Sequence, residues 1–241
     1  MGRNFDQFDF RPGRALGRRY VIEEKIGAGW EGEVYHIVER GTGISRVAKF
    51  YYPDRNGKGS AARKYAVKLH RLRDCPVVIP YLYHDRLTFK GQPIDYVVAD
   101  LAPGEILSAF LRRRPGRRFQ AFEALHLLHA IASGIEPIHD RGEYHGDLHD
   151  DNILVERSGL GFRIKTVDFF DLGRPTKEKI LQDVVDIIHL FHGAVGGARF
   201  YAKQPPMVKD ICRGLKATLI RERFRTAGDL RFYLETYDWE V

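Results

Sequence analysis

The most informative part of this sequence reads His145-Gly146-Asp147-Leu148-His149-Asp150-Asp151-Asn152-Ile153-Leu154-Val155. A second acid follows in the string Val167-Asp168-Phe169-Phe170. Apolar residues at helical spacing precede the first string over Phe119–His139, and short apolar runs typical of strands follow it at Ile153–Glu156 and Phe162–Val167. The pattern therefore predicts two polar loops that a helix and two strands hold in place.

The residue types in these loops suit the transfer of a phosphoryl group. That reaction needs a carboxylate to orient the acceptor hydroxyl and oxygen ligands to hold magnesium against the phosphates. Asp147 can supply the first, and Asn152 with Asp168 can supply the second. A capping acid would explain any one of these residues, but not the whole string.

A glycine-rich string near the amino terminus reads Ile26-Gly27-Ala28-Gly29-Trp30-Glu31-Gly32-Glu33-Val34-Tyr35. It lies between strand-like runs at Tyr20–Ile26 and Gly32–Glu39, and glycines there let backbone N–H groups approach phosphate oxygens. A strand follows the glycines, whereas a dinucleotide-binding fold would place a helix there. Taken alone, the string fits a plain hairpin equally well.

Lys49 lies in Val47-Ala48-Lys49-Phe50, on the predicted third strand, Ser45–Tyr52. A lysine flanked by apolar strand residues usually extends its charge to the edge of a sheet. Beside a phosphate-binding loop, the same ammonium group can neutralise the α and β phosphates of a nucleotide. We therefore take Lys49 as a candidate phosphate ligand.

The chain divides into a β-rich amino-terminal part and an α-rich carboxy-terminal part. We expect an arm over residues 1–18, a sheet with one helix over residues 19–102, and a helical part over residues 103–241. The helix is predicted over Ser60–Asp74 with Ser60 as its cap. Further strands are predicted at Val77–Tyr83, Arg86–Phe89 and Ile94–Asp100, and further helices from Ile180 onward.

Composition sets limits on the class of protein. The chain has 241 residues, of which 44% are hydrophobic and 29% charged, as in soluble globular proteins. A net charge of +7 favours acidic partners at low salt, but a solvated basic surface accounts for it, so nucleic-acid binding is not expected. Two cysteines form no disulfide framework, and no apolar stretch is long enough to span a membrane. We expect a cytoplasmic protein.

Together these strings resemble the protein-kinase-like superfamily over residues 20–190. The resemblance implies an α+β, two-lobed fold, with a small antiparallel-sheet N-lobe, a mainly helical C-lobe, and ATP with Mg²⁺ in the cleft between them. It makes Asp147 the catalytic base and Asp183 the anchor of its loop. The remaining residues that it assigns to the nucleotide are Ile26, Val34, Ala48 and Leu154 around adenine, Asp100 and Ala102 at the hinge, and Gly27, Ala28, Gly29, Gly32 and Lys49 at the phosphates.

The sequence also departs from that family's pattern. No glutamate occurs between residues 40 and 104, so Lys49 lacks the usual helix glutamate, and we expect Asp168 to pair with it. Gly146 stands where many regulated kinases have arginine, Phe170 replaces a glycine, and the segment between Asp168 and Asp183 is short. The string from His145 to Leu154 resembles the aminoglycoside phosphotransferases.

We therefore expect a phosphotransferase that moves the γ-phosphoryl group of ATP to a hydroxyl, with a protein serine or threonine as the acceptor. Two alternatives stay open. The first is a kinase that acts on a small molecule, because the short segment after Asp168 removes the platform on which protein kinases hold a peptide. The second is an inactive pseudokinase that binds a nucleotide or a partner, because the helix glutamate is absent and Phe170 replaces a glycine.

Overall fold

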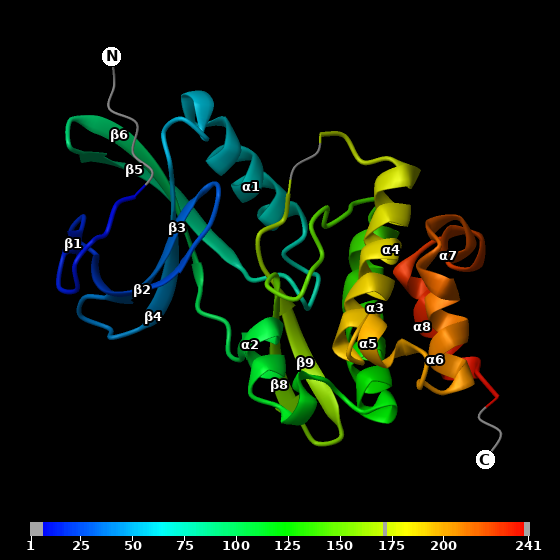
Figure 1. Cartoon of the computed structure of the whole chain (residues 1–241). Helices are drawn as coiled ribbons and strands as arrows, with labels where there is room; N and C mark the ends of the chain where they lie inside the picture. Colours follow the sequence, from blue (N-terminus) through cyan, green and yellow to red (C-terminus); the bar gives the residue numbers. More distant parts are fainter. Residues whose placement is uncertain (1–6, 171–172, 239–241) are drawn as a thin grey trace. The chain divides into compact units, whose positions relative to one another are not determined.

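The computed structural model describes residues 7–170 and 173–238, so residues 1–6 of the expected arm lie outside it. The chain forms two compact units (Figure 1). The first contains the described residues up to Asp74 together with Val78–Ala102, and the second contains Cys75–Val77 together with the described residues from Pro103 onward.

The first unit is built on a six-stranded sheet in which each strand pairs antiparallel with its neighbours. The strand order is β1-β2-β3-β4-β6-β5. Helix α1 packs against β5 and β6. The elements are β1 (Ala15–Leu16), β2 (Tyr20–Ala28), β3 (Gly32–Glu39), β4 (Ser45–Tyr51), a 3₁₀ turn at Gly57–Gly59, α1 (Ser60–Arg71), β5 (Tyr81–Phe89) and β6 (Gln92–Asp100).

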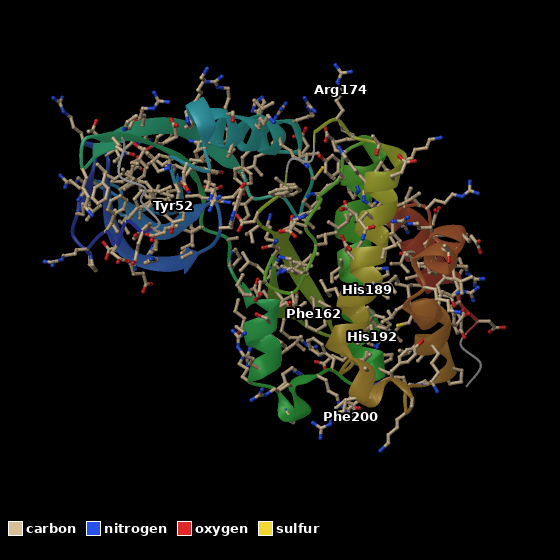
Figure 2. All side chains as sticks on the ribbon, turned by 45° about the horizontal axis from the view of Figure 1, so that its top comes forward. Tyr52, Phe162, Arg174, His189, His192 and Phe200 are labelled. Carbon is tan, nitrogen blue, oxygen red and sulfur yellow. The ribbon has the colours of Figure 1, made fainter. Side chains whose placement is uncertain are left out.

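The two faces of this sheet carry different side chains. On one face, aromatic residues of the strands pack with Phe8 and Phe10 of the amino-terminal arm. Tyr52, labelled in Figure 2, belongs to this aromatic cluster. On the other face, Tyr51 and Val97 pack with alanines of α1. Because side chains alternate along a strand, neighbouring residues of β4 serve opposite faces.

The arm is fastened to the sheet by one buried carboxylate. Glu33 of β3 accepts hydrogen bonds from the backbone N–H groups of Phe8 (3.1 Å) and Asp9 (3.3 Å). It also accepts from Lys25 Nζ (2.8 Å) and from the hydroxyl of Tyr35. The described part of the arm therefore packs on the sheet through both apolar and charged contacts.

Two predicted details of the first unit are wrong. The cap of α1 is Gly59, at φ +72°, and Ser60 is the first helical residue, so its hydroxyl makes no capping hydrogen bond. The expected strand Val77–Tyr83 begins only at Tyr81, because the carbonyl of Val77 accepts a hydrogen bond from Thr166 of the second unit's sheet. The strands expected at Val77–Tyr83 and Arg86–Phe89 are therefore one strand, β5.

The second unit is mainly helical and carries a three-stranded sheet in the order β7-β8-β9. Helix α3 is its central element, since it contacts α4, α8 and β9. The elements are β7 (Glu105–Ile106), α2 (Leu107–Arg112), α3 (Ala121–Asp140), β8 (Ile153–Ser158), β9 (Gly161–Thr166), α4 (Lys177–Ala194), α5 (Ala198–Tyr201), α6 (Pro206–Cys212), α7 (Ala217–Arg223) and α8 (Ala227–Thr236).

Both units agree with the expected fold class: an antiparallel sheet with one helix, followed by a mainly helical part. Helix α3 reproduces the predicted helix over Phe119–His139 within two residues. Within residues 7–170 and 173–238, no helix combines the length and the apolar character needed to cross a membrane.

Candidate active site

The loop that carries Asp147 is anchored by Asp183, a carboxylate of α4. Asp183, fully buried, accepts hydrogen bonds from the backbone N–H groups of His145 (2.6 Å) and Gly146 (2.9 Å). Its Oδ2 also lies 3.2 Å from Nε2 of His139 on α3. Bonds from N–H groups to a carboxylate are stronger than those to a neutral acceptor. The structure thus gives Asp183 the anchoring position that the resemblance implied.

Two polar side chains of the loop, those of Asn152 and His149, lie beside Asp147. The amide Nδ2 of Asn152 lies 2.9 Å from the main-chain oxygen of Asp147 and 3.1 Å from its Oδ2. The same amide lies 2.9 Å from Nε2 of His149, which is itself 3.5 Å from Oδ2 of Asp147. The side chain of Asp147 is half exposed. This arrangement leaves a carboxylate fixed in direction and open to an acceptor.

His149 was given no role by the sequence analysis. Its Nδ1 accepts a hydrogen bond from the backbone N–H of Asp151 at 3.2 Å. Its Nε2 lies 2.9 Å from Nδ2 of Asn152 and 3.5 Å from Oδ2 of Asp147. His149 lies two residues after Asp147 and three before Asn152, and this spacing could have indicated from the sequence that it belongs to the site.

Gly146 has a structural reason to be glycine. Its φ is +89°, and a Cβ there would lie 2.9 Å from Cε2 of Tyr144 and 3.0 Å from the carbonyl oxygen of Phe170. A side chain would therefore be strained and would push against the segment that follows Asp168. The arginine found here in many regulated kinases does not fit this backbone.

Asp168 is brought beside the loop by main-chain hydrogen bonds. The N–H of Val167 donates to the carbonyl of Asn152 (3.0 Å), and that of Phe170 donates to the carbonyl of His145 (3.1 Å). Asp168 itself adopts φ +53°, a conformation that aspartate tolerates better than most residues. These bonds place the main chain of Asn152 next to that of Asp168.

The donor set of this region fits a magnesium ion. Since the Nδ2 group of Asn152 faces Asp147, its amide oxygen is the atom left for a cation, and Asp168 adds a carboxylate. Amide and carboxylate oxygens are the ligands that magnesium prefers. The exposed neighbours His149, Asp150 and Asp151 also bring ligand atoms within 4.8 Å of one another.

In the first unit, the glycine-rich string forms the hairpin between β2 and β3. The N–H of Gly29 donates to the carbonyl of Gly32 (2.9 Å), which closes the turn, and Trp30 at the tip is 63% exposed. Gly32 is required by packing, because a Cβ there would lie 1.8 Å from the carbonyl oxygen of Phe50. Gly27 and Gly29 have room for a side chain, so space within the hairpin does not explain them.

Lys49 has an ion-pair partner that the sequence analysis did not name. Its Nζ lies 2.7 Å from Oε2 of Glu31, at the tip of the glycine-rich hairpin. The rings of Tyr51 and Tyr65 lie 5.3 and 5.2 Å from the same nitrogen. Helix α1 thus presents Tyr65, and no acid, to Lys49. The expected pairing with Asp168 joins the two units and stays a prediction.

Ala48, which was assigned to the adenine site, lies on the face of the sheet opposite to Lys49. Ala48 pairs with Tyr35 across β3 and β4, and both are fully buried in the aromatic cluster. Val34 pairs with Lys49, so these two side chains share the opposite face. Val47, two residues before Lys49, lies on that face and replaces Ala48 as the candidate.

The other residues expected to contact the nucleotide base are divided between the two units. Ile26, on β2, is 47% exposed, and Leu154 is partly buried on β8 between the buried Ile153 and Val155. Asp100, at the end of β6, donates its N–H to the carbonyl of Pro80 (3.1 Å) and pairs with Arg46 through its side chain. Ala102 is the last residue of the first unit. Their roles stay predictions.

A groove of about 580 Å³ lies beside the loop that carries Asp147, within the second unit. Its floor includes a stripe of α4, where Figure 2 labels His189. Burial raises the pKa of Asp186 in this stripe, against the hydrogen bond that Gln182 donates to it (2.8 Å). Its lining includes Ser108 and Arg112 of α2, His149 and Asp150 of the loop, and Asp186 and His189 of α4.

Comparison with known proteins adds three findings. Residues 20–185 match the model of the protein kinase domain. The chain is 31% identical over 155 residues to the serine/threonine-protein kinase PKH3 of Eremothecium gossypii, which covers 62% of this chain and 20% of that protein. It is 27% identical over 161 residues to the serine/threonine-protein kinase pkn2 of Myxococcus xanthus, which covers 64% and 18%. The chain thus spans about a fifth of the length of these relatives.

Among solved structures, the kinase domain of PknI from Mycobacterium tuberculosis resembles this fold. A double mutant of that domain aligns with a TM-score of 0.64 and 20% sequence identity, over 95% of this chain and 97% of the other. A single mutant of the same domain aligns with a TM-score of 0.62. At this identity, the likeness supports the fold.

Proposed function

Because this chain belongs to the protein kinase domain family, we propose that it transfers the γ-phosphoryl group of ATP to the hydroxyl of a serine or threonine in a protein. The observation that carries this proposal is the loop geometry. Asp147 is oriented by Asn152 and His149, and its backbone is fixed by Asp183. A carboxylate fixed in this way is what orients an acceptor hydroxyl in phosphoryl transfer.

In the proposed reaction, the acceptor oxygen attacks the γ-phosphorus and its proton passes to the carboxylate of Asp147. The bond from the γ-phosphorus to the bridging oxygen breaks, and ADP leaves. Asn152 and Asp168 would hold magnesium, which neutralises phosphate charge when bound. Lys49 and the glycine-rich hairpin, Gly27–Gly32, would bind the phosphates, while Ile26, Val34, Val47 and Leu154 would enclose adenine.

A cytoplasmic location is part of the proposal. Cys75 and Cys212 are both buried, and neither takes part in a disulfide. Burial raises the pKa of Cys212 to about 12, which keeps this thiol protonated and unreactive. Buried cysteines outside disulfides suit a reducing compartment.

The groove beside Asp147 supports a second candidate, a kinase with a small acceptor. Its volume of about 580 Å³ lies in the range of small-molecule sites, and His149 and Asp150 of the catalytic loop line it. The residues between Asp168 and Asp183 are too few to build a large peptide platform. Either acceptor would take the phosphoryl group directly from ATP and would give its hydroxyl proton to Asp147.

The test is incubation of the purified chain with labelled ATP and magnesium, with and without a mixture of generic protein acceptors. Mass spectrometry then locates the label. Label on serine or threonine supports the proposal, and label only on added small hydroxyl compounds supports the second candidate. Binding of ATP without any transfer would identify a pseudokinase and overturn both. The same assay on Asp147→Asn should show reduced transfer. Its matched control is Asp140→Asn, which changes an exposed acid at the end of α3.

A further inference from the structure

The proposed function assigns the ammonium group of Lys49 to the phosphates of ATP. In the structure this group forms an ion pair with Glu31. The Nζ–Oε2 distance is 2.7 Å, and the side chains are only 11% and 27% exposed. Lys49 lies on β4, whereas Glu31 lies on the tip of the hairpin between β2 and β3. The hairpin proposed to bind phosphates therefore places the carboxylate of Glu31 beside Lys49, the lysine proposed to bind the same phosphates.

The backbone around Glu31 is built to hold this pair. The carbonyl of Glu31 accepts a hydrogen bond from the N–H of Tyr52 (2.9 Å), one strand position beyond Tyr51. The next residue, Gly32, approaches the carbonyl of Phe50 too closely for any side chain. The main chain of Glu31 and Gly32 is thus held against the end of the strand that carries Lys49.

The surroundings of the pair strengthen it. Lys49 Nζ lies 5.3 Å from the ring of Tyr51 and 5.2 Å from that of Tyr65. The side chains of the pair are only 11% and 27% exposed, so the attraction between the two charges is screened less than on an open surface. An exposed pair would contribute little, but a half-buried one competes effectively with an incoming anion.

We propose that Glu31 is a counter-ion that the phosphates of ATP must displace from Lys49. This inference rests on the proposed function. The carboxylate and the triphosphate are both anions that seek the same ammonium, and they repel each other if both remain. Binding therefore requires the Glu31 side chain to leave, and the unliganded protein has a lower affinity for ATP than Lys49 alone would give.

Glu31→Gln separates this role from others, because the amide keeps the shape and loses the charge. We expect MgATP to bind about 3- to 10-fold more tightly, the effect of removing one partly buried charge pair. Adenosine carries no phosphate, so its affinity should not change. Glu24→Gln removes the same charge from an exposed position of β2 and should leave MgATP affinity within about twofold.

The hairpin carries its own reporter for the binding measurement. Trp30 precedes Glu31, and Arg55 lies 4.6 Å from its ring. The chain has two tryptophans, and the other, Trp239, lies outside the described residues. In a Trp239→Phe background, fluorescence of Trp30 reports on the hairpin, and calorimetry gives the affinity for MgATP and for adenosine.

A second background shows whether the gain acts through Lys49. In Lys49→Met, the addition of Glu31→Gln should bring no further gain, because the ammonium group for which both anions compete is gone. A gain that persists in Lys49→Met, or MgATP affinity in Glu31→Gln that is unchanged or weaker, would overturn the inference while leaving ATP binding intact. If neither the wild type nor Glu31→Gln binds MgATP, the proposed function itself falls.

Discussion

His139 of α3 and Asp183 of α4 face each other in a fully buried contact of 3.2 Å. The backbone N–H of Ala227 donates to Nδ1 of His139 (3.0 Å), so the neutral ring carries its proton on Nε2 and donates it to Asp183. One chain of hydrogen bonds therefore links the start of α8 to the loop that carries Asp147. The position of the proposed base depends on the packing of three helices.

Asp183→Asn should lower both stability and activity. The amide replaces one acceptor oxygen with a donor, so the N–H groups of His145 and Gly146 lose a charged acceptor. We expect the free energy of unfolding to fall by about 2–4 kcal/mol, measured by urea denaturation. Wild-type stability in this variant would show that the anchor is dispensable.

Asp186→Asn is the matched variant one turn further along α4. It should raise the free energy of unfolding, whereas Asp183→Asn should lower it. Burial raises the pKa of Asp186 above its ordinary value of 3.8, so the folded protein disfavours the charged form. Wild-type stability should therefore decline relative to Asp186→Asn as the pH rises from below 3.8 through the raised pKa. Thermal unfolding of both proteins across this pH range measures the difference.

Glu33→Gln tests the anchor of the amino-terminal arm. Burial raises the pKa of Glu33, but hydrogen bonds from Lys25, Tyr35 and Phe8 outweigh it and leave the pKa below its ordinary value of 4.5. The substitution should cost about 1–3 kcal/mol at neutral pH, because buried donors lose their acceptor. Thermal unfolding should show this difference in full above the unfolded-state pKa of 4.5.

The same difference should shrink as the pH falls through the lowered pKa of folded Glu33, since the wild type then also loses the charge. Glu24→Gln, which removes an exposed charge from β2, is the control and should change stability by less than about 0.5 kcal/mol. A difference that does not depend on pH would mean that charge plays no part in holding the arm.

The parts of the site that are local in sequence could be predicted, because their residues meet within a few positions. Asn152 reaches Asp147 inside one loop. The anchor Asp183 could be named from the family resemblance, although it is distant in sequence. The structure places Asp183 against this loop, while the catalytic and metal-binding roles of Asp147, Asn152 and Asp168 stay predictions.

Long-range and directional features could not be predicted in the same way. Glu31 was visible in the glycine-rich string, but its contact with Lys49 depends on how the hairpin lies on β4. The face of Ala48 depends on the register of β3 with β4, and a one-residue shift reverses it. The strand predicted at Val77–Tyr83 begins only at Tyr81, and the carbonyl of Val77 accepts a hydrogen bond from the N–H of Thr166.

Gly146→Ala should destabilise the protein more than a second glycine substitution nearby. Gly142 also has a positive φ, +67°, but no atom lies within 4 Å of its added Cβ, whereas Gly146 meets Tyr144 and Phe170. We expect Gly142→Ala to cost about 1–2 kcal/mol and Gly146→Ala to cost about 1–2 kcal/mol more, as measured by urea denaturation. Equal costs would show that the loop relaxes around the new methyl group.

Asp168→Ala should remove the magnesium dependence of nucleotide binding, because a divalent ion would lose its carboxylate ligand. Calorimetry of ATP with and without magnesium measures this. We expect the wild type to bind more tightly with magnesium and the variant to bind equally in both conditions. Retained magnesium enhancement in Asp168→Ala would assign the ion to other ligands.

The role of Asp147 as the catalytic base is tested most directly by the rate of phosphoryl transfer in Asp147→Asn, measured in a single turnover with labelled ATP. The amide keeps the contacts with Asn152 but cannot accept the hydroxyl proton. We predict a rate about 10²–10⁴-fold below the wild type, with MgATP affinity unchanged. A rate equal to that of the wild type would show that Asp147 only caps its loop and would contradict the account.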